Sequence, residues 1–167
     1  ETTGTELWKS DGTVAGTVLV KDIYSGSSSS SPNDLYVFGG EVLFEATDGT
    51  LGDELWKTDG TEAGTVLVKD IVSGSTRSSP GYFLAMGGAV YFMATTSATG
   101  YELWRTDGTE AGTSMVMDVY PGASQSYPIP LAASADRLIF GAATAPAGWE
   151  LWSTDGTEAG TSMVKDL

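Results

Sequence analysis

Residues 54–61 of this chain read Glu-Leu-Trp-Lys-Thr-Asp-Gly-Thr, and the recurrence of this stretch decides the fold. Its first three residues occur four times, and the copies begin at Glu6, Glu54, Glu102 and Glu150. Its last three residues recur in the same way, from Asp11, Asp59, Asp107 and Asp155. Consecutive copies lie 48 residues apart without a gap, which chance does not produce, so the chain is a tandem repeat.

Each repeat is expected to fold as four short strands. In the first full repeat these strands cover residues 35–38, 41–46, 53–58 and 65–71. Gly39 and Gly40 separate the first two apolar runs, which favours a tight hairpin with a primed turn. Residues 59–64 supply the Asp and Gly of a turn, and the Ser-rich residues 72–81 connect to the next repeat.

The apolar residues of these strands predict an all-β fold made of tandem four-stranded antiparallel blades of a β-propeller. Residues 42–44 and 66–68 are apolar at consecutive positions, so both faces of the sheet are expected to be buried. A blade packed between two neighbours requires this, and about 40 to 50 residues is the usual length of a blade. A β-trefoil and a stacked β-solenoid are the alternatives that the pattern leaves open.

The repeats divide the 167 residues into a half-blade and three full units. Residues 1–23 correspond to the third and fourth strands of a blade, and the full repeats span 24–71, 72–119 and 120–167. All are expected to belong to one repeat domain. Propeller rings have about four to eight blades, so the sequence predicts either part of a longer chain or subunits that associate through exposed ends.

The composition excludes several classes of function. Twenty-two acidic and eight basic residues give a formal charge of -14, which repels nucleic acid and anionic lipid. The chain has no cysteine and no histidine, which excludes thiol nucleophiles, imidazole acid–base chemistry and the usual zinc sites. No apolar run reaches the roughly 18 residues of a membrane helix. The sequence therefore predicts no enzyme, no nucleic-acid partner and no membrane insertion, and leaves only glycosidase-type carboxylate chemistry open.

The repeated motif resembles that of the ELWxxDGT repeat family, and the resemblance covers essentially the whole chain. The motif departs from residues 54–61 only slightly, with Arg105 and Ser153 in place of Lys57. The resemblance implies a bacterial protein with propeller-like repeats, located outside the cell or at its surface. The exposed ends of an open arc of blades predict that the partners are the protein itself or further repeats of it, with surface polysaccharide as a further candidate.

Residues that recur in every repeat are expected to serve the fold. They are Trp8, Trp56, Trp104, Trp152, Asp11, Asp59, Asp107 and Asp155. The tryptophans are interpreted as packing between blades and not as platforms for sugar. The aspartates are interpreted as turn residues, because one Asp supplies too few oxygens for calcium. No cofactor is expected, and calcium is the one exception considered.

The position before each Glu-Leu-Trp varies and is the candidate ligand-binding position. It is occupied by Asp53, Tyr101 and Trp149 in the three full repeats. Polar and aromatic variation at one rim position is typical of a binding surface, although plain surface variation also explains it.

Five acids outside the repeat pattern fall in one repeat, and no catalytic residue is assigned among them. They are Asp34, Glu41, Glu45, Asp48 and Asp53. They are interpreted as a solvated surface, with calcium binding and a glycosidase pair as alternatives. Asp48 and Asp53 are the two calcium candidates.

The function predicted from the sequence is a non-catalytic extracellular module for adhesion, scaffolding or self-assembly at a bacterial surface. A carbohydrate-binding lectin that uses rim aromatics is the first alternative. A glycoside-acting propeller enzyme is the second.

Overall fold

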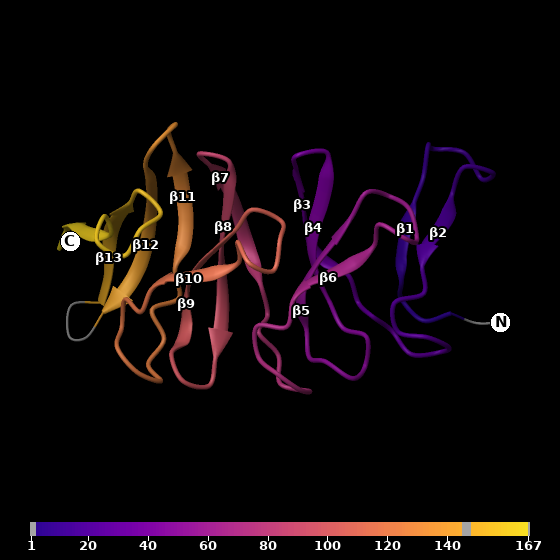
Figure 1. Ribbon diagram of the computed structural model, residues 1–167, viewed down its shortest axis with the longest axis horizontal. Coiled ribbons are helices and arrows are strands. Elements are labelled where there is room, and N and C mark those ends of the chain that lie inside the picture. Colours follow the sequence, from indigo (N-terminus) through magenta and orange to yellow (C-terminus); the bar gives the residue numbers. More distant parts are fainter. Residues whose placement is uncertain (1–2, 145–147, 167) are drawn as a thin grey trace. The chain divides into compact units, whose positions relative to one another are not determined.

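β-strands are the only regular elements in the residues that the structure, a computed structural model, describes, which are 3–144 and 148–166 (Figure 1). A half-sheet contains β1 (Leu7–Lys9) and β2 (Val18–Lys21). The first blade contains β3 (Asn33–Phe38), β4 (Glu41–Ala46), β5 (Glu54–Thr58) and β6 (Val66–Lys69). The second blade contains β7 (Gly81–Met86), β8 (Ala89–Thr96), β9 (Gly100–Thr106) and β10 (Ser114–Met117). The third blade contains β11 (Ile129–Ala133), β12 (Leu138–Thr144), β13 (Gly148–Thr154) and β14 (Ser162–Lys165).

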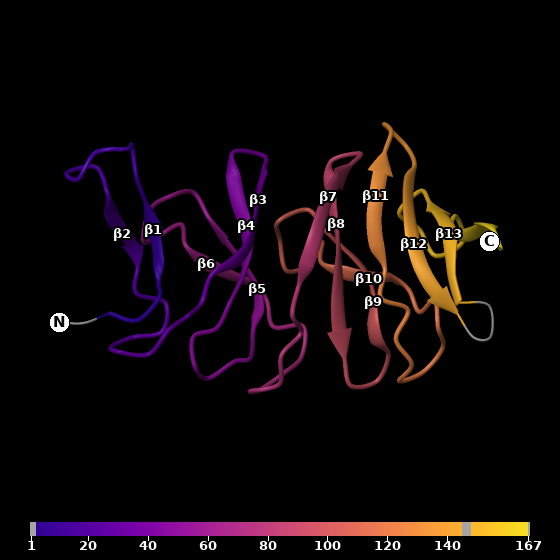
Figure 2. The ribbon, with the colours of Figure 1, turned by 180° about the vertical axis from the view of Figure 1, so that it is seen from behind.

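Every sheet is an antiparallel meander in which each strand pairs with its neighbour along the chain (Figure 1, Figure 2). The register is the same in the three blades and places a Phe opposite the Trp of each Glu-Leu-Trp motif. The pairs are Phe44 with Trp56, Phe92 with Trp104 and Phe140 with Trp152. This arrangement confirms the prediction of four-stranded antiparallel blades.

The chain divides into two compact units, Glu1–Ser79 and Pro80–Leu167. The first unit holds the half-sheet and the first blade, and the second unit holds the second and third blades. Both faces of the central strands are buried, as expected from their unbroken apolar runs. The consecutive residues Tyr91 and Phe92 of β8, for example, are both buried.

The core of the first unit forms between the half-sheet and the first blade. Its buried residues are Leu7, Val20, Ile23, Phe44, Ala46 and Trp56. Two lysine side chains of the half-sheet reach carbonyl groups of the first blade. Lys9 Nζ donates to the Gly60 carbonyl at 2.8 Å, and Lys21 Nζ donates to the Thr65 carbonyl at 2.7 Å. Apolar packing and these polar ties join the two sheets.

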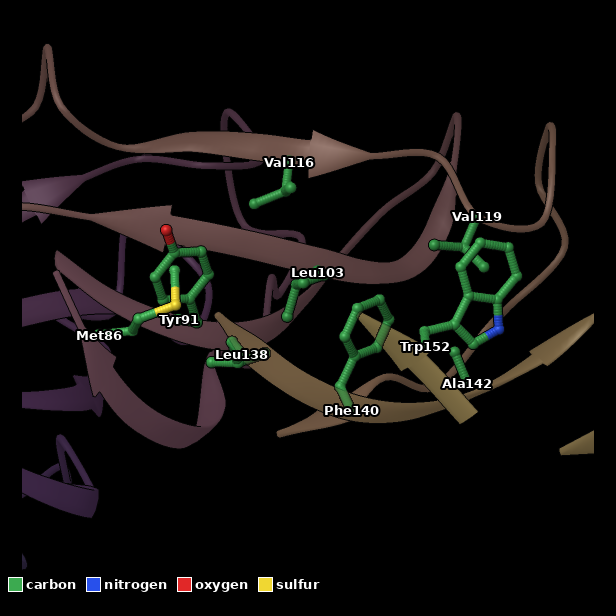
Figure 3. Packing of buried hydrophobic residues seen from close by; sticks show 9 residues of the cluster. All are labelled: Met86, Tyr91, Leu103, Val116, Val119, Leu138, Phe140, Ala142 and Trp152. Atoms are coloured by element: carbon green, nitrogen blue, oxygen red, sulfur yellow. The ribbon is translucent and has the colours of Figure 1, made fainter. Parts of the chain in front are cut away.

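The core of the second unit forms between the second and third blades (Figure 3). Its buried residues are Met86, Tyr91, Leu103, Val116, Val119, Leu138, Phe140, Ala142 and Trp152. The Arg105 guanidinium donates from Nη1 to the Gly156 carbonyl at 3.2 Å. Arg105 and Lys9 occupy the same repeat position, and each reaches an Asp-Gly-Thr loop of the following blade.

The hairpin between the first two strands of each blade depends on its glycines. Gly39 and Gly40 have φ values of 61° and 87°, as a primed two-residue turn requires. In the third blade Ala135 and Asp136 replace the two glycines, and there Ala133 pairs with Leu138 around a four-residue loop. The amide of Ser134 donates to the Arg137 carbonyl at 2.8 Å. The turn of the third blade is therefore longer than the turns that contain two glycines. The sequence predicts a weaker tendency to form the tight turn at this place.

The half-sheet has a more open surface than the blades. Within the described residues β1 pairs only with β2, whereas the equivalent strand β5 pairs with both β4 and β6. Trp8 of β1 is accordingly 51% exposed, and the equivalent Trp56 is 7% exposed. Trp56 packs in the core that the first blade forms with the half-sheet, so the facing sheet and the neighbouring strand both contribute to its burial.

Candidate functional site

Buried glutamates, each next in sequence to a candidate binding residue, hold the loops that follow the blades. Glu54 accepts hydrogen bonds from the Ile71 amide at 2.8 Å and from Ser78 Oγ at 2.6 Å. Glu102 accepts the equivalent bonds from the Val119 amide at 2.9 Å and from Ser126 Oγ at 2.7 Å. Each glutamate therefore fixes both ends of the loop that follows its blade.

Burial raises the pKa of these carboxyl groups. The pKa of Glu54 and that of Glu102 rise from 4.5 to about 7. The hydrogen bonds favour the ionised form and oppose the rise, while the carboxylates of Asp70 and Asp118 add to it. These side chains titrate near neutral pH because the fold withdraws them from water.

The Asp-Gly-Thr turns lie exposed at the joint between the third and fourth strands. In the first blade Asp59 Oδ1 accepts from the Thr61 amide at 2.8 Å and from Thr61 Oγ1 at 2.6 Å. These bonds lower the pKa of Asp59, and the bond from the Thr61 side chain has the larger effect. Gly64 is needed beside them, because a Cβ at this residue would lie 2.1 Å from Asp59 Oδ1. Asp59, Thr61 and Gly64, and their equivalents in the other repeats, therefore form one turn.

A cavity of about 370 Å³ lies in the first unit at the start of β5. It is lined by Thr5, Ser31, Pro32, Asn33, Glu45 and Asp53. Glu45 lies in β4 and Asp53 directly precedes β5, so the pairing of these strands brings the two carboxylates to one place. This acidic cavity is the candidate functional site of the first unit.

The electrostatics of this cavity favour a positive charge. Burial is the largest effect that raises the pKa of the Glu45 carboxyl, and the charge of Asp53 is the next. Asn33 donates a hydrogen bond that opposes the rise, and Asp34 contributes a further repulsion. Arg77 Nε pairs with Asp53 Oδ2 at 3.1 Å, and the Arg77 side chain is 74% exposed. The carboxylates thus attract a cationic side chain that otherwise lies in solvent.

The structure brings together only part of the acidic set singled out in the sequence. Glu45 and Asp53 line the cavity, and Asp34 is close enough to influence Glu45. Glu41 pairs instead with Lys57 Nζ at 3.0 Å. Asp48 Oδ1 accepts from the amides of Thr50 and Leu51 at 2.8 Å each, so Asp48 is engaged in a turn of its own. In residues 3–144 and 148–166 no three acidic side chains are grouped so as to hold a metal ion.

The two aromatic candidates have different surroundings in the second unit. Tyr101 stacks on Tyr127, with ring centroids 5.4 Å apart and planes at 23°. Trp149 is 48% exposed. Its ring covers Gly141, where an added Cβ would lie 2.9 Å from the indole. Asp53, Tyr101 and Trp149 therefore share a repeat position but have different neighbours.

Sequence reasoning missed Tyr127 and Arg77 as neighbours of the candidate positions. Tyr127 occupies the position of Ser31 and Ser79, and all three residues precede a proline and have positive φ values of 47°, 50° and 45°. A tyrosine at a position held elsewhere by serine is a break in the repeat that could have identified it. Arg77 lies in a loop without a repeated motif, and only the structure places it at Asp53.

Comparisons with known proteins bear on the fold. No family model matches the chain, and no curated protein matches it. One similar solved structure is the β-propeller domain of the Trilobed protease from Pyrococcus furiosus, which has an open velcro topology. It is 18% identical, with a TM-score of 0.50, over 80% of this chain and 40% of that chain. Another is the acylaminoacyl peptidase of Pyrococcus horikoshii, 18% identical, with a TM-score of 0.49, over 79% of this chain and 20% of that chain.

The class defined by the fold is therefore the β-propeller. The likeness to the protease domain, together with the meandering four-stranded sheets, confirms the propeller prediction over the trefoil and the solenoid. The chain spans about two fifths of the length of the Trilobed protease chain that it matches. No helix in the described residues is long and apolar enough to cross a bilayer.

The function predicted from the sequence is wrong in the light of these comparisons. A surface module for adhesion, scaffolding or self-assembly was expected from the repeats. The propeller domain that shares this fold instead belongs to a protease. The reason for the error is that a repeat specifies how blades are built, while function resides in sites that the repeat does not encode.

Proposed function

We propose that this chain is part of a β-propeller domain of a longer peptide-hydrolysing protein, in which it binds polypeptide without cleaving it. The observation that carries the proposal is the cavity lined by Glu45 and Asp53 in a chain of formal charge -14. A similar propeller domain is part of a protease, which is why polypeptide is the proposed class of ligand. The absence of histidine and cysteine from the sequence agrees with a binding role.

The ligand group proposed for this cavity is a basic side chain of the polypeptide. Burial raises the pKa of Glu45 most, and repulsion from Asp53 adds to the rise, so a cation between the two carboxylates stabilises their charged forms. A cavity of about 370 Å³ accommodates one lysine or arginine side chain. The net negative charge of the chain attracts such a segment over longer distances.

Arg77 is the internal competitor for this cavity in the proposed function. Its guanidinium pairs with Asp53, and its side chain is mostly exposed. An exposed ion pair contributes only about 0 to 1 kcal/mol, so an incoming basic side chain displaces it at little cost.

The test compares a lysine-rich peptide with a glutamate-rich peptide of equal length. The lysine-rich peptide is expected to bind, and Glu45→Gln is expected to weaken its binding about fivefold, as loss of one partly exposed charge pair allows. Glu62→Gln is the matched control, because Glu62 is an exposed acid of the same unit outside the cavity. Equal binding of both peptides, or equal effects of both substitutions in calorimetric titrations, would contradict the proposal.

The membership in the ELWxxDGT repeat family and the extracellular or cell-surface location stay predictions. The same holds for association with further repeats of the protein.

A further inference from the structure

A second cavity, of about 500 Å³, lies in the second unit where β9 and β13 end. Tyr101 and Trp149 lie at the starts of these strands. The hairpin turns of the second and third blades border it, together with their Asp-Gly-Thr loops. Its lining includes Met86, Tyr91, Arg105, Asp107, Asp136 and Asp155. Its volume is that of a site for a small molecule.

Three of the polar lining residues break the 48-residue repeat. Tyr91 stands where the other full repeats have Leu43 and Ile139. Asp136 stands where they have Gly40 and Gly88, and Arg105 stands where the other units have Lys9, Lys57 and Ser153. Residues common to all repeats serve the fold, so departures that gather around one cavity indicate a feature particular to that place.

Tyr91 and Arg105 are fixed in position by the third blade. Tyr91 is 2% exposed, and its hydroxyl lies so close to Gly156 that a Cβ there would be 2.1 Å away. In the view of Figure 3, Met86 and Tyr91 mark one end of the core cluster, and the Tyr91 hydroxyl points away from Leu103 and Phe140. Arg105 Nη1 donates to the Gly156 carbonyl at 3.2 Å. The guanidinium is therefore held in place and retains further N–H donors.

The charges around the cavity have both signs, which restricts the ligand. A ligand with positive charge alone would meet Arg105, and one with negative charge alone would meet three aspartates. A ligand that carries both an ammonium and a carboxylate satisfies both groups. Met86 and Ala89 add an apolar wall.

We propose that this cavity binds a small zwitterion with a free α-ammonium and a free α-carboxylate, either an amino acid or a short peptide. The carboxylate is bound by Arg105 and the Tyr91 hydroxyl, and the ammonium is bound by Asp136 with Asp155. The proposal concerns residues of the second unit and does not rest on the acidic cavity of the first unit.

The experiment titrates the chain with the dipeptide Gly-Leu, with its N-acetylated and C-amidated derivatives, and with leucine. Gly-Leu is expected to bind, and each blocked derivative is expected to bind about tenfold more weakly, because one charge-assisted hydrogen bond is lost. Leucine that binds as tightly as Gly-Leu identifies an amino-acid site, and leucine that binds more weakly identifies a peptide site. Both results support the proposal.

Two substitutions test the residues while restoring the repeat. Asp136→Gly introduces the glycine of Gly40 and Gly88, and Arg105→Lys introduces the lysine of Lys9 and Lys57, so both variants are compatible with the fold. Each is expected to weaken Gly-Leu binding about tenfold. Glu158→Gln, at an exposed acid of the same unit outside the lining, is expected to leave it unchanged. The absence of Gly-Leu binding at millimolar concentration, equal binding of the blocked derivatives, or unchanged binding by Asp136→Gly would overturn the proposal.

Discussion

Each buried glutamate of the Glu-Leu-Trp motif connects two positions that are distant in sequence. Ser78 lies 24 residues after Glu54, and its hydroxyl donates to the Glu54 carboxylate at 2.6 Å. A buried acid is stable only where donors surround it, and here a backbone amide and a serine hydroxyl do so. The repeat identifies the glutamate, but the serine lies in a loop where several serines are equivalent by sequence. Only the folded loop selects the partner.

The raised pKa values of Glu54 and Glu102 predict that the protein loses stability as the pH rises from acidic to slightly alkaline values. Their pKa is about 7 in the folded chain against an ordinary 4.5, so the folded state favours the protonated form. This contribution is complete below 4.5 and is lost as the pH rises through 7. The urea midpoint is therefore expected to fall between about pH 5 and about pH 8.

The substitution Glu54→Gln isolates this contribution, because the amide has the same size and does not ionise. The variant is expected to show a smaller change in the urea midpoint over this pH range than the natural chain. Glu62→Gln, at an exposed position, is expected to keep the natural pH dependence. An unchanged pH dependence in Glu54→Gln would assign the effect to other groups. The turn aspartates act in a different range, since the lowered pKa of Asp59 gives stability that is lost only below 3.8.

At the scale of the elements, the strands and tight turns follow from the sequence more closely than the loops. β4 has the predicted bounds, and β5 begins one residue later than expected, with the Asp53 carbonyl just before it accepting from the amides of Ser78 and Ser79. The Gly39-Gly40 turn is predictable from the positive φ that glycine allows. The four-residue turn at Asp136 is only partly predictable. The missing glycine disfavours the tight turn, but the sequence does not define which turn forms instead.

Trp8 and Trp56 form a matched pair for measuring what a neighbouring strand and a facing sheet together contribute to stability. Trp8 and Trp56 occupy the same repeat position, but Trp8 is 51% exposed and Trp56 is 7% exposed. Trp56→Ala is expected to lower the free energy of unfolding by about 3 to 5 kcal/mol, as for a buried tryptophan. Trp8→Ala is expected to cost about half of that or less, because half of the side chain is already in water. Urea unfolding of the two variants checks this, and equal losses would mean that Trp8 is as well packed as Trp56.

At the scale of the whole molecule, the propeller fold was predictable and the function was not. A gapless period of 48 residues with Gly-Gly hairpins specifies a blade. The Glu-Leu-Trp motif occurs four times along the chain, so the same pattern supports this fold repeatedly. The two cavities depend on residues that occur once, such as Glu45 in one unit and Asp136 in the other. Their convergence results from strand pairing and from the packing of blades. A sequence pattern without an alignment does not reveal which single departures meet in space.

The formal charge of -14 predicts that salt affects peptide binding in two separable ways. Long-range attraction of a lysine-rich peptide is screened beyond about 10 Å at about 100 mM salt, so the association rate is expected to fall steeply between about 50 and about 500 mM. The contact with Glu45 and Asp53 lies in a half-enclosed cavity and is screened less. The ratio of affinities between the natural chain and Glu45→Gln is therefore expected to persist at high salt while both affinities fall. Stopped-flow association and equilibrium titration over this range measure the two effects. A ratio that falls to one at high salt would mean that Glu45 acts only through the general negative field, and that the acidic cavity makes no direct contact with the peptide.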